Sequence, residues 1–114
     1  MSYNKVAGVL EAQGDLAGAL KNYRDKFAIT EKLASQDPTN ATWQNDAAWT
    51  RYCVAKVLIR SKDGDRNEAR RLVIEGIDIM TGLEHQGALD TNAQDILNKL
   101  NEIATALTSS SSGY

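Results

Sequence analysis

The 114-residue sequence is 42% hydrophobic and 25% charged, and it carries a formal net charge of −2. This balance argues against nonspecific binding to nucleic acids or anionic membranes, and no apolar run approaches the ~20 residues that span a bilayer. One cysteine excludes an internal disulfide and fits a reducing compartment, so we expect a cytoplasmic protein.

The chain begins with two segments of helical periodicity joined by a tight turn. Residues 3–13 place apolar side chains on one helical face, and residues 16–35 do the same. Gly14 suits the left-handed position that ends a helix, and Asp15 suits the N-cap of the next helix. The sequence therefore predicts an antiparallel helical hairpin over residues 3–35.

Two longer helices are expected next. Asn40 or Thr39 can cap a helix over residues 41–60. Asp65 and Glu68 have the spacing of a capping box, in which the side chains at N-cap and N3 bond to each other's backbone, at the start of a helix over residues 66–84. These signals predict a second hairpin over residues 40–85.

The second hairpin repeats the first. Val6–Leu10 aligns with Val54–Leu58 at an offset of 48 residues, and Gly14-Asp15 aligns with Gly64-Asp65 at an offset of 50. Because the turn and the apolar positions repeat together, the pattern is typical of a helical repeat array.

A last helix is expected over residues 91–107, where Thr91 and Gln94 have capping-box spacing. Its single apolar stripe fits a capping helix over residues 90–107, which covers the last hairpin and shows water a polar face. Residues 108–114 are rich in serine, and we expect them to be disordered. The expected organisation is one helical domain over residues 1–107.

The residues of both hairpins resemble the tetratricopeptide repeat (TPR) motif, and are most similar to a long-repeat bacterial subclass with a period of about fifty residues. The residues that carry the resemblance in the first hairpin and its loop are Tyr3, Val6, Ala7, Leu10, Gly14, Leu16, Ala19, Tyr23, Phe27 and Pro38. The sequence departs from the motif at Ala7, at Lys26 and Phe27, and at Val73.

The TPR resemblance implies an all-α fold, a right-handed superhelical array of antiparallel helix hairpins. About five helices are expected, the last of them the C-terminal capping helix. It also implies protein–protein contact and no reaction.

The first helix is expected to be about half as long as the third, so we expect the chain to begin in the middle of a repeat unit. We expect either a fragment of a longer array or an open end that something else covers. A second copy of the chain could cover the apolar edge along Val6, Val9 and Leu10. A homodimer is therefore an alternative. A third alternative is the C-terminal accessory part of a larger multidomain protein.

No motif for catalysis or for a cofactor is present: the sequence has no P-loop, no dinucleotide-binding glycine pattern and no H-E-x-x-H. Cys53 is expected to be a small buried residue and His85 a solvated loop residue. Asp63 and Asp65 fit a turn and a helix cap better than a calcium loop. We therefore expect no enzymatic activity, no cofactor and no metal.

The remaining candidate site is a surface. In TPR arrays the first helix of each pair lines the concave groove, and amides, cations and aromatic rings there suit an extended peptide. The alternative is a solvated helix face with Trp49 packed into the core. Lys56 and Arg60 match only part of the lysine and asparagine pattern with which chaperone-binding TPRs clamp a partner's carboxylate. The partner-binding residues that the family register implies include Asn4, Glu11, Tyr52, Lys56 and Arg60. Asn45 and Trp49 join the same stripe of the third helix at spacings of three or four residues.

The expected function is non-catalytic protein–protein interaction, in which a protein or peptide binds the concave face. We expect no nucleic acid and no membrane as partner.

Overall fold

A computed structural model describes the backbone of residues 3–62 and 64–112, and the side chains of residues 8–62 and 64–108. Over this part of the chain it contains five helices and no strand, which confirms the predicted all-α class. The helices are α1 (Tyr3–Ala12), α2 (Leu16–Gln36), α3 (Ala41–Arg60), α4 (Arg66–His85) and α5 (Thr91–Ser112).

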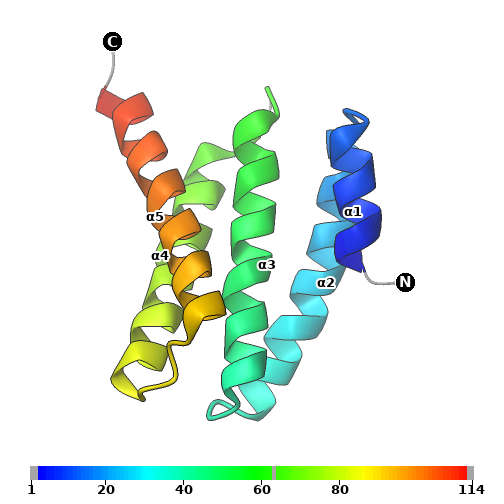
Figure 1. The fold of residues 1–114 in the computed structure, drawn as a ribbon. Coiled ribbons are helices and arrows are strands. Elements are labelled where there is room, and N and C mark those ends of the chain that lie inside the picture. The colour runs from blue at the N-terminus through cyan, green and yellow to red at the C-terminus, as the bar shows by residue number, and fades with distance from the viewer. Residues whose placement is uncertain (1–2, 63, 113–114) are drawn as a thin grey trace.

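The helices form two layers. Figure 1 shows α1, α3 and α5 on the side facing the viewer, with α2 and α4 behind them. The extents of 38 × 37 × 22 Å agree with this flat shape, since two packed helices are about 20 Å thick. Helix α3 is central because it packs against α2, α4 and α5.

The turn between α1 and α2 has the predicted chemistry. Gly14 has φ of +85°, and the amide of Asp15 donates to the carbonyl of Leu10 while that of Gly14 donates to the carbonyl of Glu11. This pair of bonds is the Schellman motif at a helix C-terminus. The carboxylate of Asp15 accepts from the amide of Gly18 at 2.9 Å, so the expected N-cap of α2 is confirmed.

The later helix starts confirm two expected caps and correct a third. Asn40 caps α3 and Asp65 caps α4. For α5, the carboxylate of Asp90 accepts from the amide of Ala93 at 2.8 Å, and Thr91 is already the first residue of the helix. The capping box expected at Thr91 is therefore wrong, because the preceding carboxylate satisfies the free amide instead.

Positions that correspond in the two hairpins have similar burial. Ala19 and Ala69 are both fully buried, and Tyr23 and Val73 lie together in the core. Val9 departs from this pattern, because its side chain is 56% exposed whereas that of Val57 is fully buried. The sequence repeat thus predicts the burial of side chains in the core better than at the edge formed by α1.

The two glycines that the repeat aligns have different structural roles. Gly14 supplies a positive φ, whereas Gly64 lies so close to the carbonyl oxygen of Leu58 that an added Cβ atom would overlap it. The backbone contact at Gly64 lets the chain turn tightly from α3 toward α4.

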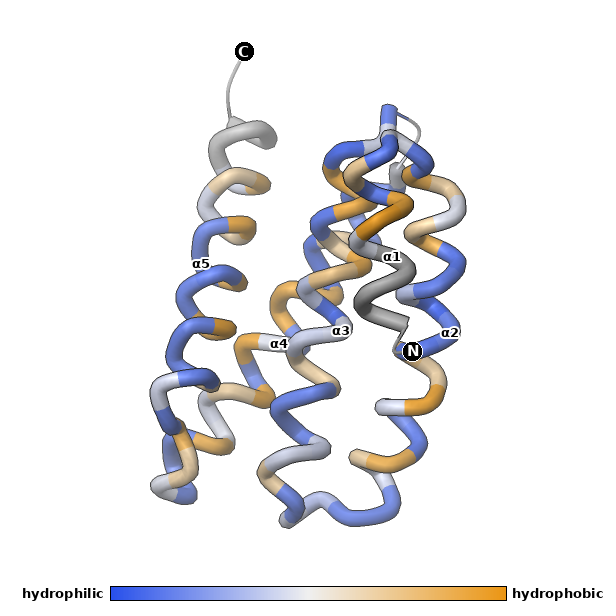
Figure 2. Tube along the Cα trace, turned by 45° about the vertical axis from the view of Figure 1, so that its right-hand side comes forward, coloured by the Kyte–Doolittle hydropathy of each residue, from blue (hydrophilic) through white to orange (hydrophobic). Residues whose placement is uncertain are grey.

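Helix α5 covers the end of the core with an apolar stripe. Figure 2 shows its hydrophobic residues turned toward α3 and α4 and its hydrophilic residues on the outer side. Leu100 is fully buried, and its methyl groups would lie 3.1 Å from a Cβ atom at Gly76. The absence of a side chain at Gly76 therefore allows α5 to approach α4 closely.

Helix α5 also extends farther than expected, to Ser112 rather than residue 107, into the segment expected to be disordered. Leu107 is buried at its inner face, and the hydroxyl of Thr108 donates to the carbonyl of Ala104. These contacts support continuation of the helix beyond the expected end. Residues 113 and 114 lie outside the described part of the chain.

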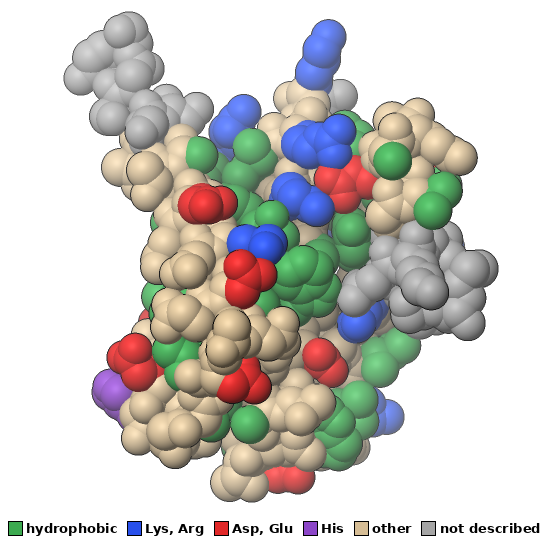
Figure 3. Space-filling model, viewed as in Figure 1, with side chains coloured by type: hydrophobic (Ala, Val, Ile, Leu, Met, Phe, Trp, Pro, Cys, Tyr) green, Lys and Arg blue, Asp and Glu red, His purple; other side chains and the backbone are tan. Residues whose placement is uncertain are grey.

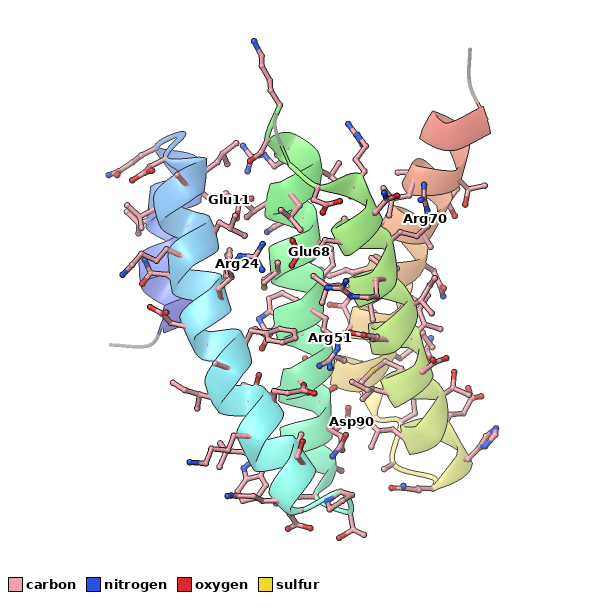
Figure 4. The ribbon with its side chains drawn as sticks, turned by 180° about the vertical axis from the view of Figure 1, so that it is seen from behind. Glu11, Arg24, Arg51, Glu68, Arg70 and Asp90 are labelled. Carbon is pink, nitrogen blue, oxygen red and sulfur yellow. The ribbon has the colours of Figure 1, made fainter. Side chains whose placement is uncertain are left out.

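A buried arginine joins three helices (Figure 4). Arg51 on α3 is 7% exposed, and its guanidinium donates to Glu31 on α2 at 2.8 Å and to Glu75 on α4 at 3.2 Å. A third bond goes to the carbonyl of Ala47, and the group lies 4.9 Å from the ring centroid of Phe27. Three hydrogen bonds and one aromatic ring therefore compensate this buried charge.

Helices α2 and α4 have a second, more exposed contact. Arg24 donates two hydrogen bonds of 2.7 Å to the two carboxylate oxygens of Glu68, and Figure 4 shows these side chains pointing toward one another. Glu68 is the residue expected to complete the capping box of α4, and its carboxylate is used by Arg24 instead.

None of the helices in the described ranges combines the length and the apolar character needed to cross a lipid bilayer.

Replacing Gly64 with alanine is expected to destabilise the protein by about 2 kcal/mol or more, because the new Cβ atom overlaps the Leu58 carbonyl. The matched control is Gly82→Ala, where nothing lies near the added atom and the helix gains stability of about 1 kcal/mol. Chemical denaturation of both variants measures these changes. Equal effects of the two substitutions would contradict the backbone contact.

Replacing Arg51 with methionine is expected to cost about 3 kcal/mol, because two carboxylates lose a buried partner. Arg24→Met is the control and should cost below about 1 kcal/mol, since the Arg24 side chain is 46% exposed. Thermal and urea unfolding of the two variants give the comparison. A similar loss in both would show that Arg51 has no special role.

Candidate functional site

The residues expected to bind a partner form a row along α3. Asn45, Trp49, Tyr52 and Lys56 are each half-buried, and Arg60 is exposed at the end of the helix. They recur every three or four residues, so they share one face of the helix. This row belongs to the face built by α1, α3 and α5, which Figure 3 shows from the front. The side chain of Asn4 lies outside the described residues.

Two aromatic rings occupy the middle of the row. The rings of Trp49 and Tyr52 have centroids 5.3 Å apart and are tilted by 34°, and the Lys56 ammonium lies 5.5 Å from the Tyr52 centroid. Trp49 packs against the core and still keeps part of its surface in solvent. Its ring therefore supports the core while part of its surface stays exposed.

Glu11 from α1 pairs with the basic end of the row. The side chain of Glu11 is 9% exposed, and its carboxylate forms ion pairs with Lys56, at 3.3 Å, and with Arg60. The hydroxyl of Tyr23 also donates to it, at 3.4 Å. The two cations expected to meet a partner's carboxylate are thus engaged within the protein, and Glu11 links α1 to α3.

Burial beneath this face suppresses ionisation of two side chains. Burial is the largest cause that raises the pKa of Tyr23, and the nearby Cys53 and Glu11 add to it. Burial likewise raises the pKa of the Cys53 thiol to about 12. Cys53 is 1% exposed and protonated at neutral pH, so it is an inert core residue. His85 is exposed and ends α4.

A depression of about 360 Å³ lies between α3 and α5, beside the aromatic pair. Its walls combine two amides, two carboxylates, an indole and an aliphatic side chain. These lining residues are Asn45, Asp46, Trp49, Asn92, Asp95 and Ile96. The Oδ1 atom of Asn45 is buried and has no hydrogen-bond partner among the residues that the structure describes. A ligand N–H or O–H group would satisfy this acceptor once the half-buried Asn45 side chain turns to expose it.

A second depression of about 270 Å³ adjoins the first toward the start of α5. The two share Asn45, Asp46 and Asn92, and the second adds Asp90. Together they extend the half-buried row on α3 into a groove with a polar floor.

The contribution of α5 was missing from the sequence-based site. Asp95 and Ile96 follow Asn92 by three and four residues, the spacing that also separates the residues of the row on α3. This spacing would have predicted Asn92, Asp95 and Ile96 as site residues if α5 had been treated as a groove-lining helix and not only as a cap.

A larger depression, of about 490 Å³, lies between α2 and α4 on the other side of the molecule. Arg24 and Glu68 line it, and their charges are already satisfied by two mutual hydrogen bonds. We favour the smaller depression at α3 and α5, because the expected partner-binding residues Asn45 and Trp49 line it and the buried Asn45 Oδ1 atom has no partner among the described residues.

Within the described ranges, no cluster of three or more histidine, cysteine, aspartate or glutamate side chains could hold a metal ion.

Comparison of the chain with protein-family models, curated proteins and solved structures gives no match. The class that the structure itself defines is a two-layered all-α protein with a polar and aromatic groove along its central helix.

The burial of Cys53 predicts a loss of stability at alkaline pH. Its thiol pKa rises from 9.0 in the unfolded chain to about 12 in the fold, so between these values only the unfolded state releases the proton. Stability is full below pH 9 and falls above it, by up to roughly 1.4 kcal/mol per pH unit. Tyr23 acts in the same direction, because its pKa is also raised.

Denaturant unfolding at several alkaline pH values measures this slope. Cys53→Ala should be less stable overall but should have a shallower alkaline slope, because one of the two groups is gone. An identical slope in both proteins would contradict the role of Cys53.

Proposed function

We propose that the protein is a non-catalytic binding module that holds an extended segment of a protein partner along α1, α3 and α5. The observation that carries this proposal is the half-buried row on α3, beside a groove whose Asn45 acceptor has no partner in the described structure. An extended peptide offers backbone N–H groups that fit such an acceptor.

The dimensions of the row suit a short segment. Asn45 and Lys56 are eleven positions apart, or about 16 Å along a helix axis. An extended chain covers this distance with about five residues. Trp49 and Tyr52 in the middle supply the rigid aromatic area that is common at the centres of interfaces.

We also propose that the chain is a TPR-like array with a right-handed superhelical arrangement. The support comes from the repeat in the sequence, from the matched burial of Ala19 and Ala69, and from the placing of alternate helices in opposite layers. In this arrangement α1, α3 and α5 are the groove-lining helices.

Self-association is the second candidate. Its support is the exposure of Val9 on α1, at 56%, where the repeat-equivalent Val57 is buried. The side chain of Val6, expected on the same edge, lies outside the described residues. Light scattering over a wide concentration range tests this candidate: a dimer that Val9→Asp dissociates supports it, and a monomer at all concentrations contradicts it.

Selection from a random peptide display library is expected to enrich peptides that bind through Trp49. Fluorescence polarisation with an enriched peptide should show about tenfold or greater weakening for Trp49→Ala and a smaller loss for Trp49→Phe, which keeps a ring. The control is Ile74→Ala, because Ile74 is an exposed apolar residue on α4.

Circular dichroism of each variant confirms that the helices persist. The proposal fails when no peptide is enriched, or when enriched peptides bind the Trp49 and Ile74 variants equally well.

A further inference from the structure

We propose that the groove between α3 and α5 captures a positively charged side chain, a lysine or an arginine, of the bound peptide. This inference rests on the proposed function and specifies the chemistry of the partner. It comes from the charges of the lining residues and from the contacts that those residues already make.

The two adjoining depressions are lined by three carboxylates and by no lysine or arginine. Asp90 is occupied as the N-cap of α5, and Asp95 pairs with Lys99 at 2.7 Å. The carboxylate of Asp46 makes no hydrogen bond or ion pair within the described structure, although its backbone carbonyl accepts from Thr50. Asp46 is therefore the uncompensated charge of the groove.

The helix dipoles do not cancel this charge. The N-termini of α3 and α5 both lie at this end of the molecule, and their partial positive charge acts mainly within the first turn. Asp46 and Asp95 follow the first turns, which are residues 41–44 and 91–94. The local field in the groove is thus set by the carboxylates.

The neighbours of Asp46 suit a cation that also donates hydrogen bonds. Trp49 lines the same depression, and the face of an indole ring attracts a lysine or arginine head group. The Oδ1 atom of Asn45 has no partner among the described residues, and a turn of this half-buried side chain would offer it to an N–H donor of the ligand. Carboxylate, indole and amide oxygen together match an ammonium or guanidinium group, and a carboxylate ligand would meet repulsion from Asp46.

The other end of the same face has the opposite character. Figure 3 shows most of the Lys and Arg side chains in the upper half of this face and most of the Asp and Glu side chains in the lower half. The lower half corresponds to the N-terminal ends of α3 and α5 in Figure 1. Lys56 and Arg60, toward the upper end, are engaged by Glu11. Among the carboxylates that line the groove, the uncompensated one is Asp46, at the acidic end.

The test uses peptides enriched by Trp49-dependent binding. Replacing their lysine with norleucine, or their arginine with citrulline, is expected to weaken binding about tenfold. Asp46→Asn should give a similar loss, and combining both changes should cost little more than either alone, because they remove the same contact. The matched control is Asp78→Asn, an exposed carboxylate on α4 with the same change in net charge.

Two results would overturn this inference: Trp49-dependent peptides with no basic residue that binding requires, or an affinity for such peptides that Asp46→Asn leaves unchanged. The proposed function stands in either case. When no Trp49-dependent peptide is enriched, the proposed function fails, and an NMR titration with N-acetyl-arginine methylamide decides the inference separately. A shift of the Trp49 indole signal that the citrulline analogue does not cause supports the cation site. The absence of that shift overturns it, and the Trp43 signal is the internal reference.

Discussion

The position of α3 depends on the buried guanidinium of Arg51. A charge that is 7% exposed is tolerated in a protein only when its hydrogen-bonding groups are satisfied, and here α2 and α4 each supply a carboxylate. Both carboxylates are themselves more than 40% exposed, so they keep much of their hydration while they neutralise the arginine. The contact therefore fixes the spacing of three helices with little cost from desolvated acids.

Most of the secondary structure could be predicted because its signals are local. Gly14 and Asp15 act on their own turn, so their roles followed directly from residue type. The start of α5 was harder, since Asp90 and Thr91 are both suitable caps and packing decides between them. The glycine at position 64 was aligned correctly by the repeat, but its close approach to Leu58 depends on tertiary structure that no local pattern encodes.

Only the part of the candidate site that lies on α3 could be predicted from the sequence. Helical periodicity places Asn45, Trp49 and Tyr52 on one face of α3, and the structure shows that face partly exposed. Periodicity does not tell which helix lies beside that face, so the walls supplied by α5 were missed. For the same reason the sequence did not reveal that Glu11 would pair with both cations of the row, the more distant of which, Arg60, is 49 positions away in the sequence.

The two opposite faces of α3 have different structural roles. Arg51 fixes the rear of the helix, and Trp49 and Tyr52 stand on its front, only a few residues away. Ordering a surface during binding costs conformational entropy for each side chain that must be immobilised. Here the backbone beneath the aromatic pair is already held on the far side, and the rings pack on each other. The groove is therefore preorganised, so little of the energy of a contact made there is spent on shaping it.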